Sequence, residues 1–271
     1  MSQISARAVN ELRNRTGQGM MECKKMLTES GGDIEKAIEG FRKKGVKASI
    51  LERAATEGRI VGAVAPSGKI AALVEVNCNT DFTAKSEPIL ALARNAANAL
   101  LADSAKDVKA DPSLTAAAAE VARQTGENVQ IGRTAVLSNS AGKVGLYLYE
   151  TAGKGKIGVL VSVSGDASQE LINDLGMHIA AARPLALDRN GIPADVVAKE
   201  REIAIEQAKA TGKPQQIAEK IAEGKMRTFY EEKALLDQPF INAEKFKGSV
   251  AAMLKGKGVT LNEYVRLEVG Q

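Results

Sequence analysis

The sequence predicts an α+β protein, and three observations lead to this fold class. Helical periodicity runs through residues 1–46. β-like runs separated by turn sequences then occur in two similar sets, each followed by a helical pattern, and a long helix–turn–helix pattern is inserted late in the chain. Strands joined by short turns pair antiparallel, so we expect a core of two subdomains with antiparallel sheets.

The predicted organisation divides the chain into five parts. They are a helical bundle at 1–46, a linker helix at 47–58, a first core subdomain at 59–140, a second core subdomain at 141–187 and 233–271, and an inserted antiparallel helical hairpin at 188–232. A chain of 271 residues exceeds the usual single-domain size, and its 44% hydrophobic content can fill more than one core.

The N-terminal part reads as three short helices separated by glycine-containing turns. Ser5 and Asp33 have the residue types that cap helix N-termini. The apolar positions that follow the helical period, or flank it as a hydrophobic staple, are Ile4, Val9, Leu12, Met20, Cys23, Leu27, Ile34, Ala37, Ile38 and Phe41. A bundle of this size is below the range in which a core is comfortably stable, so we expect an accessory binding module.

In the first core subdomain, Arg59–Ala65 and Ile70–Val76 flank the turn sequence Pro66–Lys69 and should pair as a hairpin. An irregular segment, Asn77–Phe82, follows. The remaining predicted elements are a helix at 87–102 that packs across the hairpin, a helix at 113–124 and a strand at 129–137.

The second core subdomain repeats this order in part. Strand-like runs at 144–149 and 157–163 flank a Gly153–Lys156 loop, a helix covers 168–182, and a final strand covers 264–269. Within the insert at 188–232, helical stretches flank Thr211–Pro214, a sequence that can only turn. Its predicted apolar seam is Val196, Val197, Ile203, Ile205, Ile217, Ile221 and Met226. Projecting hairpins of this kind commonly serve association.

Composition excludes several classes of protein. The chain has 37 Lys+Arg against 33 Asp+Glu, 3% aromatic residues and no Trp, which disfavours nucleic-acid modules that stack bases on exposed aromatics. The basic stretches at Arg42–Lys47 and at Lys154 and Lys156 are short enough to be solvated faces. No apolar run is long enough to span a membrane and no signal-peptide core is visible, so we expect a cytoplasmic protein.

The residues that could carry chemistry are few. The single histidine, His178, lies on a predicted helix without a serine or cysteine partner, and reads either as a satisfied helical side chain or as a partner contact. Cys23 and Cys78 form no C-x-x-C motif, so no zinc site or disulfide is expected. A phosphate-binding loop sequence is missing as well. We therefore expect no enzyme activity, no metal, no cofactor and no direct nucleotide binding.

Phe82 is unusual in a chain with so few aromatic residues. It follows an acidic residue, after a predicted strand and just before a helix. Such a Phe is either a buried hydrophobic anchor or an exposed one that meets a partner, and the pattern alone favours burial.

Two sequence motifs resemble signatures of the elongation factor Ts family. They are Glu75–Phe82 (EVNCNTDF) and Leu12–Lys25 (LRNRTGQGMMECKK). The likeness spans essentially the whole chain, and its other matching stretches are Gly31–Ala37, Gly126–Asn128, Met177–His178, Gly212–Pro214 and Arg266–Gly270. The chain departs from the family where it has Thr83 in place of the usual Val and Asn79 in place of Glu or Gln.

This resemblance implies a fold and a function. The N-terminal bundle would be similar to ubiquitin-associated domains and the inserted hairpin would be a coiled coil. The protein would be a guanine nucleotide exchange factor for elongation factor Tu, a GTPase, and would act in translation elongation by disturbing the magnesium and phosphate site. The segment Thr80, Asp81, Phe82 and Thr83, here called the wedge segment, would enter the GTPase.

The same resemblance implies docking contacts outside the wedge segment. Leu12, Arg13, Met20 and Met21 of the bundle would dock on the GTPase, although Leu12 and Met20 fit core packing equally well. His178 would reach a different domain of the partner. The resemblance allows a homodimer or a 2:2 complex. A nucleic-acid-binding protein and a protein-binding adaptor without exchange activity are the alternatives, and an enzyme is the weakest one.

Overall fold

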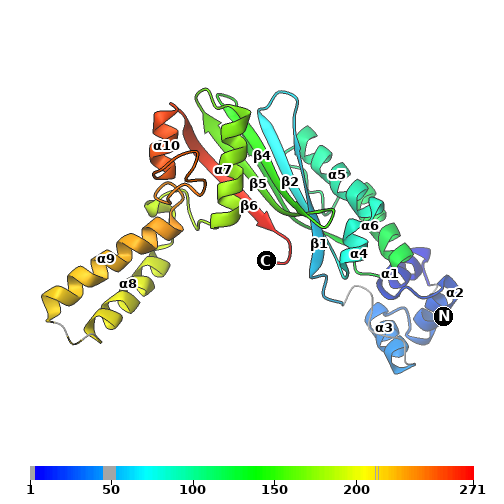
Figure 1. Cartoon of the computed structure of the whole chain (residues 1–271). Helices are drawn as coiled ribbons and strands as arrows, with labels where there is room; N and C mark the ends of the chain where they lie inside the picture. Colours follow the sequence, from blue (N-terminus) through cyan, green and yellow to red (C-terminus); the bar gives the residue numbers. More distant parts are fainter. Residues whose placement is uncertain (1–3, 45–52, 211, 213) are drawn as a thin grey trace.

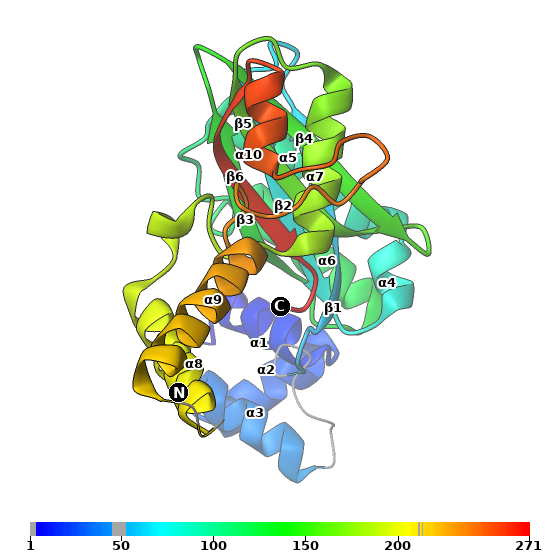
Figure 2. The same ribbon diagram turned by 60° about the vertical axis from the view of Figure 1, so that its left-hand side comes forward.

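The computed structural model describes residues 4–44, 53–210, 212 and 214–271. A central body of sheets and helices carries a three-helix bundle at one end and a helical hairpin at the other (Figure 1). Both additions extend from the same side of the body, which gives the molecule the outline of an arch in Figure 1, and the turned view also places both of them below the sheets (Figure 2). The prediction of an α+β fold with two antiparallel sheets is confirmed.

The N-terminal bundle consists of α1 (Ala6–Thr16), α2 (Met20–Glu29) and α3 (Ile34–Lys43). The Ser5 hydroxyl accepts a hydrogen bond from the Ala8 amide at 3.1 Å, and Asp33 caps α3 in the same way. The side chains that form the bundle core are Val9, Leu12, Cys23, Met26, Leu27, Ala37, Ile38 and Phe41. Met20, predicted to be on the buried stripe, is 49% exposed, and Met26 contributes to the core instead.

The first sheet has the order β1–β2–β3 and is antiparallel throughout. Its strands are β1 (Glu57–Val64), β2 (Ile70–Cys78) and β3 (Gln130–Ser138). Helices α5 (Glu87–Ala102) and α6 (Pro112–Thr125) pack on its outer face. The predicted hairpin is confirmed. The predicted linker helix is not seen where it can be tested: 47–52 lies outside the described residues, 53–56 is not helical, and Glu57 already belongs to β1.

The second sheet has the order β4–β5–β6 and is also antiparallel. Its strands are β4 (Lys143–Thr151), β5 (Lys154–Ser164) and β6 (Thr260–Glu268), and helices α7 (Gln169–Ala182) and α10 (Val250–Gly256) pack on its outer face. The predicted Gly153–Lys156 loop is wrong. The turn is confined to Ala152 and Gly153, with φ values of 50° and 80°, because two residues with positive φ suffice to reverse a β-hairpin.

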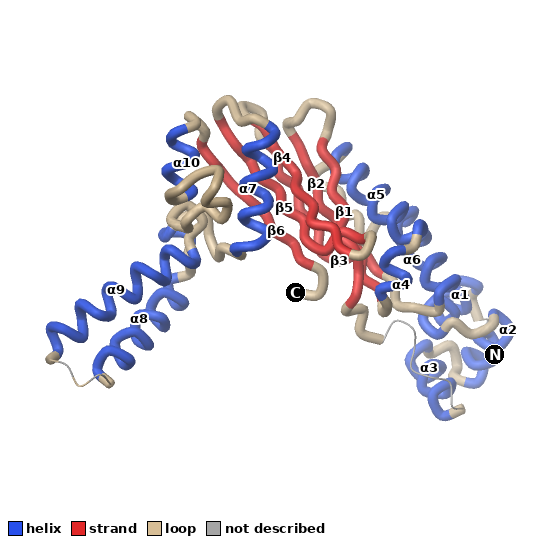
Figure 3. Tube along the Cα trace, in the orientation of Figure 1, coloured by secondary structure: helices blue, strands red, loops and turns tan. Residues whose placement is uncertain are grey.

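The two sheets pack face to face, and the central strands β2 and β5 bury both of their sides. In β5, Val159, Val161 and Val163 face the helices, whereas Leu160 joins the cluster between the sheets. That cluster consists of Ile60, Ala71, Leu73, Leu137, Val144, Leu160, Leu267 and Val269. The body therefore has four layers, with strands inside and helices outside (Figure 3). The sequence reading expected two related subdomains but did not foresee this packing.

The hairpin is built from α8 (Ala194–Lys209) and α9 (Gln215–Lys233), as predicted. Its seam agrees with the prediction at Met226, which is buried, and at Val196 and Val197, which pack beside it, but differs from the prediction elsewhere. Small side chains dominate the contact, and the buried ones are Ala204, Ala208, Ala218, Ala222, Met226 and Phe229. Ile203 and Ile217 are 38% and 45% exposed. Alanine lets two helices approach closely, which the bulkier isoleucines would prevent.

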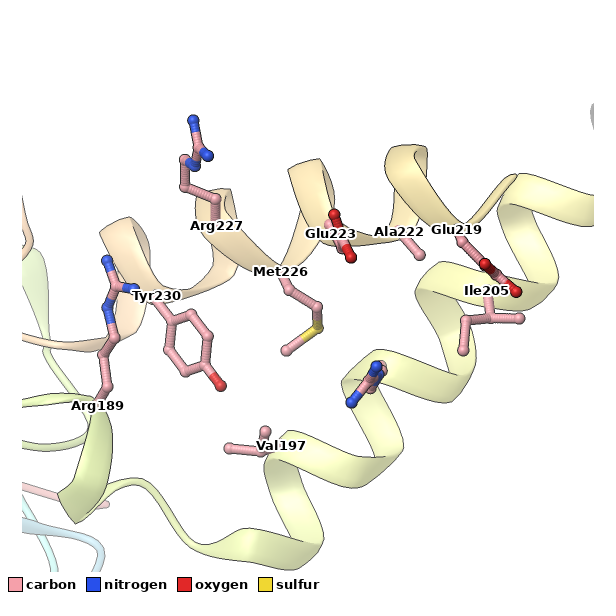
Figure 4. Close-up of a pocket in the computed structure, with 10 residues that line it drawn as sticks. Arg189, Val197, Ile205, Glu219, Ala222, Glu223, Met226, Arg227 and Tyr230 are labelled. Atoms are coloured by element: carbon pink, nitrogen blue, oxygen red, sulfur yellow. The ribbon is translucent and has the colours of Figure 1, made fainter. Parts of the chain in front are cut away.

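Near its base the hairpin contains a groove of about 520 Å³. Val197, Met226 and Tyr230 point into it, and the Arg189 guanidinium lies beside them, 5.0 Å from the centroid of the Tyr230 ring (Figure 4). The chain enters and leaves the hairpin through neighbouring segments, since Ala186 and Ala234 form a parallel β-bridge. The hairpin is thus attached at one narrow place.

Candidate functional site

The wedge segment lies directly after β2, at the start of the short helix α4 (Asp81–Lys85), on the side of the first sheet that is nearer the bundle (Figure 1). Thr80 is the N-cap, and its hydroxyl accepts a hydrogen bond from the Thr83 amide at 3.3 Å. The segment predicted to be irregular therefore ends in a helical turn. Asn77 and Cys78 still belong to β2.

Phe82 is 81% exposed, so the pattern-based preference for burial is wrong. The reason lies in the helical turn: Thr83 and Ala84 point inward and are buried, which leaves Phe82 on the outer side. No other large apolar side chain among the described residues is more exposed. Transfer of an exposed Phe ring from water into an apolar pocket is favourable, by about 1.5–3 kcal/mol when the ring becomes fully buried.

Asp81 and Lys85 flank the Phe82 ring. Their side chains form an ion pair at 2.7 Å, and the Lys85 ammonium lies 6.0 Å from the ring centroid. The hydrogen bond from Lys85 lowers the pKa of Asp81, so this carboxylate is ionised at neutral pH. The exposed tip of the wedge segment therefore presents an anion, an aromatic ring and a cation together.

The Glu127 carboxylate accepts four hydrogen bonds from the wedge segment and from the residue before it. The Thr80 and Thr83 hydroxyls donate to one of its carboxylate oxygens at 2.6 and 2.8 Å, and the Asn79 and Thr80 amides donate to the other at 2.9 and 3.0 Å. Burial raises the pKa of Glu127, but these hydrogen bonds outweigh that effect, and the pKa lies below its ordinary value. Glu127 was not among the residues predicted from the sequence, where it lies only in the matching stretch Gly126–Asn128.

Asn79 ties two further segments to the start of the site. Its side-chain oxygen accepts from the Asn128 amide at 2.8 Å, and its side-chain nitrogen donates to the Ala54 carbonyl at 2.8 Å. The two departures from the family pattern therefore have structural roles here. Asn79 bridges chain segments, and Thr83 supplies a hydroxyl to Glu127 that Val would lack.

The basic side chain of Lys154 is not on a solvated face, contrary to the prediction. It is buried, with 5% exposure, and pairs with Glu57 at 2.7 Å.

Cys78, at the end of β2, is also buried, and its thiol donates a hydrogen bond to the Thr80 carbonyl at 3.2 Å. Burial raises the pKa of Cys78 to about 11, so the thiol stays protonated and is a poor nucleophile.

The four predicted docking residues of the bundle differ in their exposure. Leu12 is fully buried in the bundle core and its side chain offers no surface to a partner, which corrects that expectation. Met20 and Met21 are 49% and 75% exposed. Arg13 is half-buried and lines a hollow of about 210 Å³ between α1 and α6. Of the four residues, the two methionines remain as open surface.

His178 is buried, with 1% exposure, and both ring nitrogens are engaged. Nδ1 accepts a hydrogen bond from the Ile241 amide at 3.2 Å, so the ring proton resides on Nε2, which donates to Gln238 Oε1 at 2.9 Å. The ring stacks on Phe240 at 5.7 Å. The side chain is thus a satisfied core histidine and cannot itself touch a partner in this conformation. Burial lowers its pKa.

The described residues contain no group of three His, Cys, Asp or Glu side chains that could hold a metal ion. Within the same part of the chain, no helix is both long enough and apolar enough to cross a membrane. The wedge segment itself presents an exposed ring, an ion pair and a support made of hydrogen bonds to Glu127.

The fold and the site together define a class of α+β protein, in which a two-sheet core carries a small helical bundle, a projecting hairpin and an exposed acid–aromatic pair. A family model described as elongation factor TS matches residues 79–271. The chain belongs to the elongation factor Ts family, and so to the elongation factors of protein biosynthesis.

Individual relatives extend this similarity over the rest of the chain. Elongation factor Ts of Methylococcus capsulatus is 44% identical, with 99% of this chain and 92% of the relative covered. The proteins of the same name from Thiobacillus denitrificans and Photorhabdus laumondii are each 41% identical over 100% of this chain, with 93% and 94% of those proteins covered.

Proposed function

We propose that this protein is the guanine nucleotide exchange factor of elongation factor Tu. It binds the GDP form of that GTPase, disturbs the magnesium and phosphate site and thereby promotes GDP release, so that GTP can bind. Family membership supports the choice of partner. The observation that carries the mechanism is Phe82, an aromatic side chain 81% exposed on a fixed helical turn.

The proposed mechanism is binding linkage and needs no covalent step, cofactor or direct contact with the nucleotide. A GTPase holds GDP through magnesium and backbone donors around the phosphates, so a ring inserted between its helices weakens that hold. The free energy comes from differential affinity. If the factor binds the empty GTPase more tightly than the GDP form, GDP affinity must fall by the same factor.

The proposal assigns different contacts to the parts of the chain. The wedge segment of the first core subdomain (59–140) enters the GTPase, and the bundle (1–46) docks beside it through Met20 and Met21. The second core subdomain (141–187 and 233–271) reaches another domain of the partner. Here His178 acts indirectly, by holding the backbone next to Ile241, which is 50% exposed. The hairpin (188–232) serves a homodimer or a 2:2 complex. The proposed compartment is the cytoplasm.

Phe82→Ala tests this mechanism. We expect GDP release from elongation factor Tu, followed by stopped-flow fluorescence of a labelled GDP, to slow by at least about tenfold, equivalent to ~1.4 kcal/mol of activation free energy. The melting midpoint should barely change, since the ring is exposed, whereas truncating a buried Phe costs about 3–5 kcal/mol. Asp81→Ala should give a milder defect.

Ile217→Ala is the control, because it truncates another exposed apolar side chain, 45% exposed, on the hairpin, which the proposal does not place against the GTPase. It should release GDP at the wild-type rate. If Phe82→Ala also keeps the wild-type rate, Phe82 is not the wedge. If the wild-type protein binds the GTPase without accelerating release, the chain is an adaptor and the exchange function is wrong.

A further inference from the structure

Glu127 lies between α6 and β3, next to Gly126, whose φ of 70° ends the helix. Its carboxylate reaches a segment 44 to 48 residues earlier in the chain and accepts four hydrogen bonds there. Each oxygen accepts two of them, so the carboxylate binds two backbone amides and two hydroxyls at once. A carboxylate has about four acceptor sites, and none is left unused.

The conformation around Phe82 depends on support from outside its own helix. Helix α4 has only 5 residues, too few to be stable by itself. Its N-cap Thr80 and its inward residue Thr83 are the two side chains that Glu127 binds. The two amides that it binds, of Asn79 and Thr80, immediately precede the helix. Thus the carboxylate fixes the backbone on one side of Phe82 and a side chain on the other.

The segment that Glu127 binds lies between two residues of the apolar core. All four donors belong to residues 79–83, whereas Cys78 before them and Ala84 after them are buried in the apolar cluster of the first sheet. Removing the carboxylate should therefore loosen this segment before it affects the sheets.

We propose that Glu127 is the positioning residue of the wedge: it holds residues 79–83 in the conformation that presents Phe82 to the GTPase. This inference rests on the proposed exchange function for its kinetic consequence. Whether Glu127 fixes the conformation of residues 79–83 can be measured on the free protein, without the GTPase.

The first experiment measures amide hydrogen exchange by NMR in the free, full-length protein. In Glu127→Ala the Asn79 and Thr80 amides should exchange at least about tenfold faster than in the wild type, because their acceptor is gone. Glu244→Ala removes an exposed carboxylate and should leave both amides protected. Glu127→Gln, which keeps one oxygen, and Thr83→Val, which removes one donor, should give intermediate rates.

The second experiment is a double-mutant cycle on GDP release. Glu127→Ala alone should slow release by at least about tenfold, but in the Phe82→Ala background it should slow release by less than about twofold, since the residue acts through that ring. A general structural defect would instead slow both backgrounds alike. Circular dichroism should show the same secondary structure in each variant, and Glu127→Gln replaces Glu127→Ala if the latter does not fold.

Two results would overturn the inference. One is unchanged protection of the Asn79 and Thr80 amides in Glu127→Ala, which would show that the carboxylate does not hold the segment. The other is an additive effect in the double mutant, which would show that Glu127 acts elsewhere. If Phe82→Ala itself has wild-type activity, the proposed exchange mechanism fails, and the amide measurement still decides whether Glu127 fixes the segment.

Discussion

His178 is a buried residue that holds an exposed segment, since its ring accepts a hydrogen bond from the amide of the half-exposed Ile241. The ring is neutral and lies between the Gln238 side chain and the Ile241 amide. A protonated ring could no longer accept from that amide, since both nitrogens would carry protons. The segment around Ile241 would then lose its anchor. Protonation is opposed by burial, which lowers the pKa of His178 below the ordinary 6.5.

This arrangement predicts a pH-dependent stability that can be assigned to one group. The unfolded chain takes up a proton on His178 below pH 6.5, whereas the folded protein does not until a lower pH. The stabilisation that depends on a neutral His178 ring is therefore fully present above pH 6.5. As the pH drops below 6.5, the free energy of unfolding falls by at most about 1.4 kcal/mol per pH unit.

Urea denaturation between pH 5 and 7.5 should show this slope in the free energy of unfolding. His178→Gln should be less stable at pH 7.5 but should lack the slope, because the chain has 1 histidine. A slope that persists in the variant would assign the effect to other groups.

At the scale of elements, local signals predicted more than distant contacts did. The predicted helix 87–102 coincides with α5, because its Ala- and Leu-rich sequence keeps one regular buried face. The paired strands of both sheets were predicted within a few residues of their ends. By contrast, nothing in the local sequence links Glu127 to Thr83, because the hydrogen bond joins residues 44 positions apart.

The hairpin illustrates a second limit of sequence reasoning. The predicted seam included four isoleucines, but alanines make most of the contact together with Met226 and Phe229, and Ile203 and Ile217 are left half-exposed. Apolar character alone does not tell which face of a helix allows the closest approach. The exposed isoleucines and the groove beside Met226 leave apolar surface on a projecting element.

We predict that replacing 192–231 with a short flexible linker preserves accelerated GDP release and alters self-association seen by light scattering. The ends can be joined easily, because the Leu235 amide donates to the Ala186 carbonyl at 2.9 Å and the Leu185 amide donates to the Lys233 carbonyl at 2.8 Å. The apolar cluster at the hairpin base is also distinct from those of the sheets. Loss of exchange with an intact circular dichroism spectrum would show that the hairpin contacts the GTPase.

At the scale of the whole molecule, the arch places the bundle near the wedge segment and the hairpin at the far end (Figure 1). The bundle has its own apolar cluster, which shares no residue with the clusters of the core. Among the described residues, α1 of the bundle meets the core at α6, where Arg13 and Gln18 line a hollow together with Ala119 and Arg123. The core should therefore fold without the bundle, whereas productive contact with the GTPase should need both.

Deleting residues 1–50 tests this division of labour. The truncated protein should remain folded, with a cooperative melting transition, because the three core clusters stay complete. It should accelerate GDP release far less than the full chain at low concentration, since the docking surface that carries Met20 and Met21 is gone.

If docking is the missing step, raising the concentration of the truncated protein should restore much of the rate, because the wedge segment is intact. Met21→Ala in the full chain should show a smaller defect of the same kind. Precipitation of the truncated protein, or full activity at every concentration, would contradict the prediction.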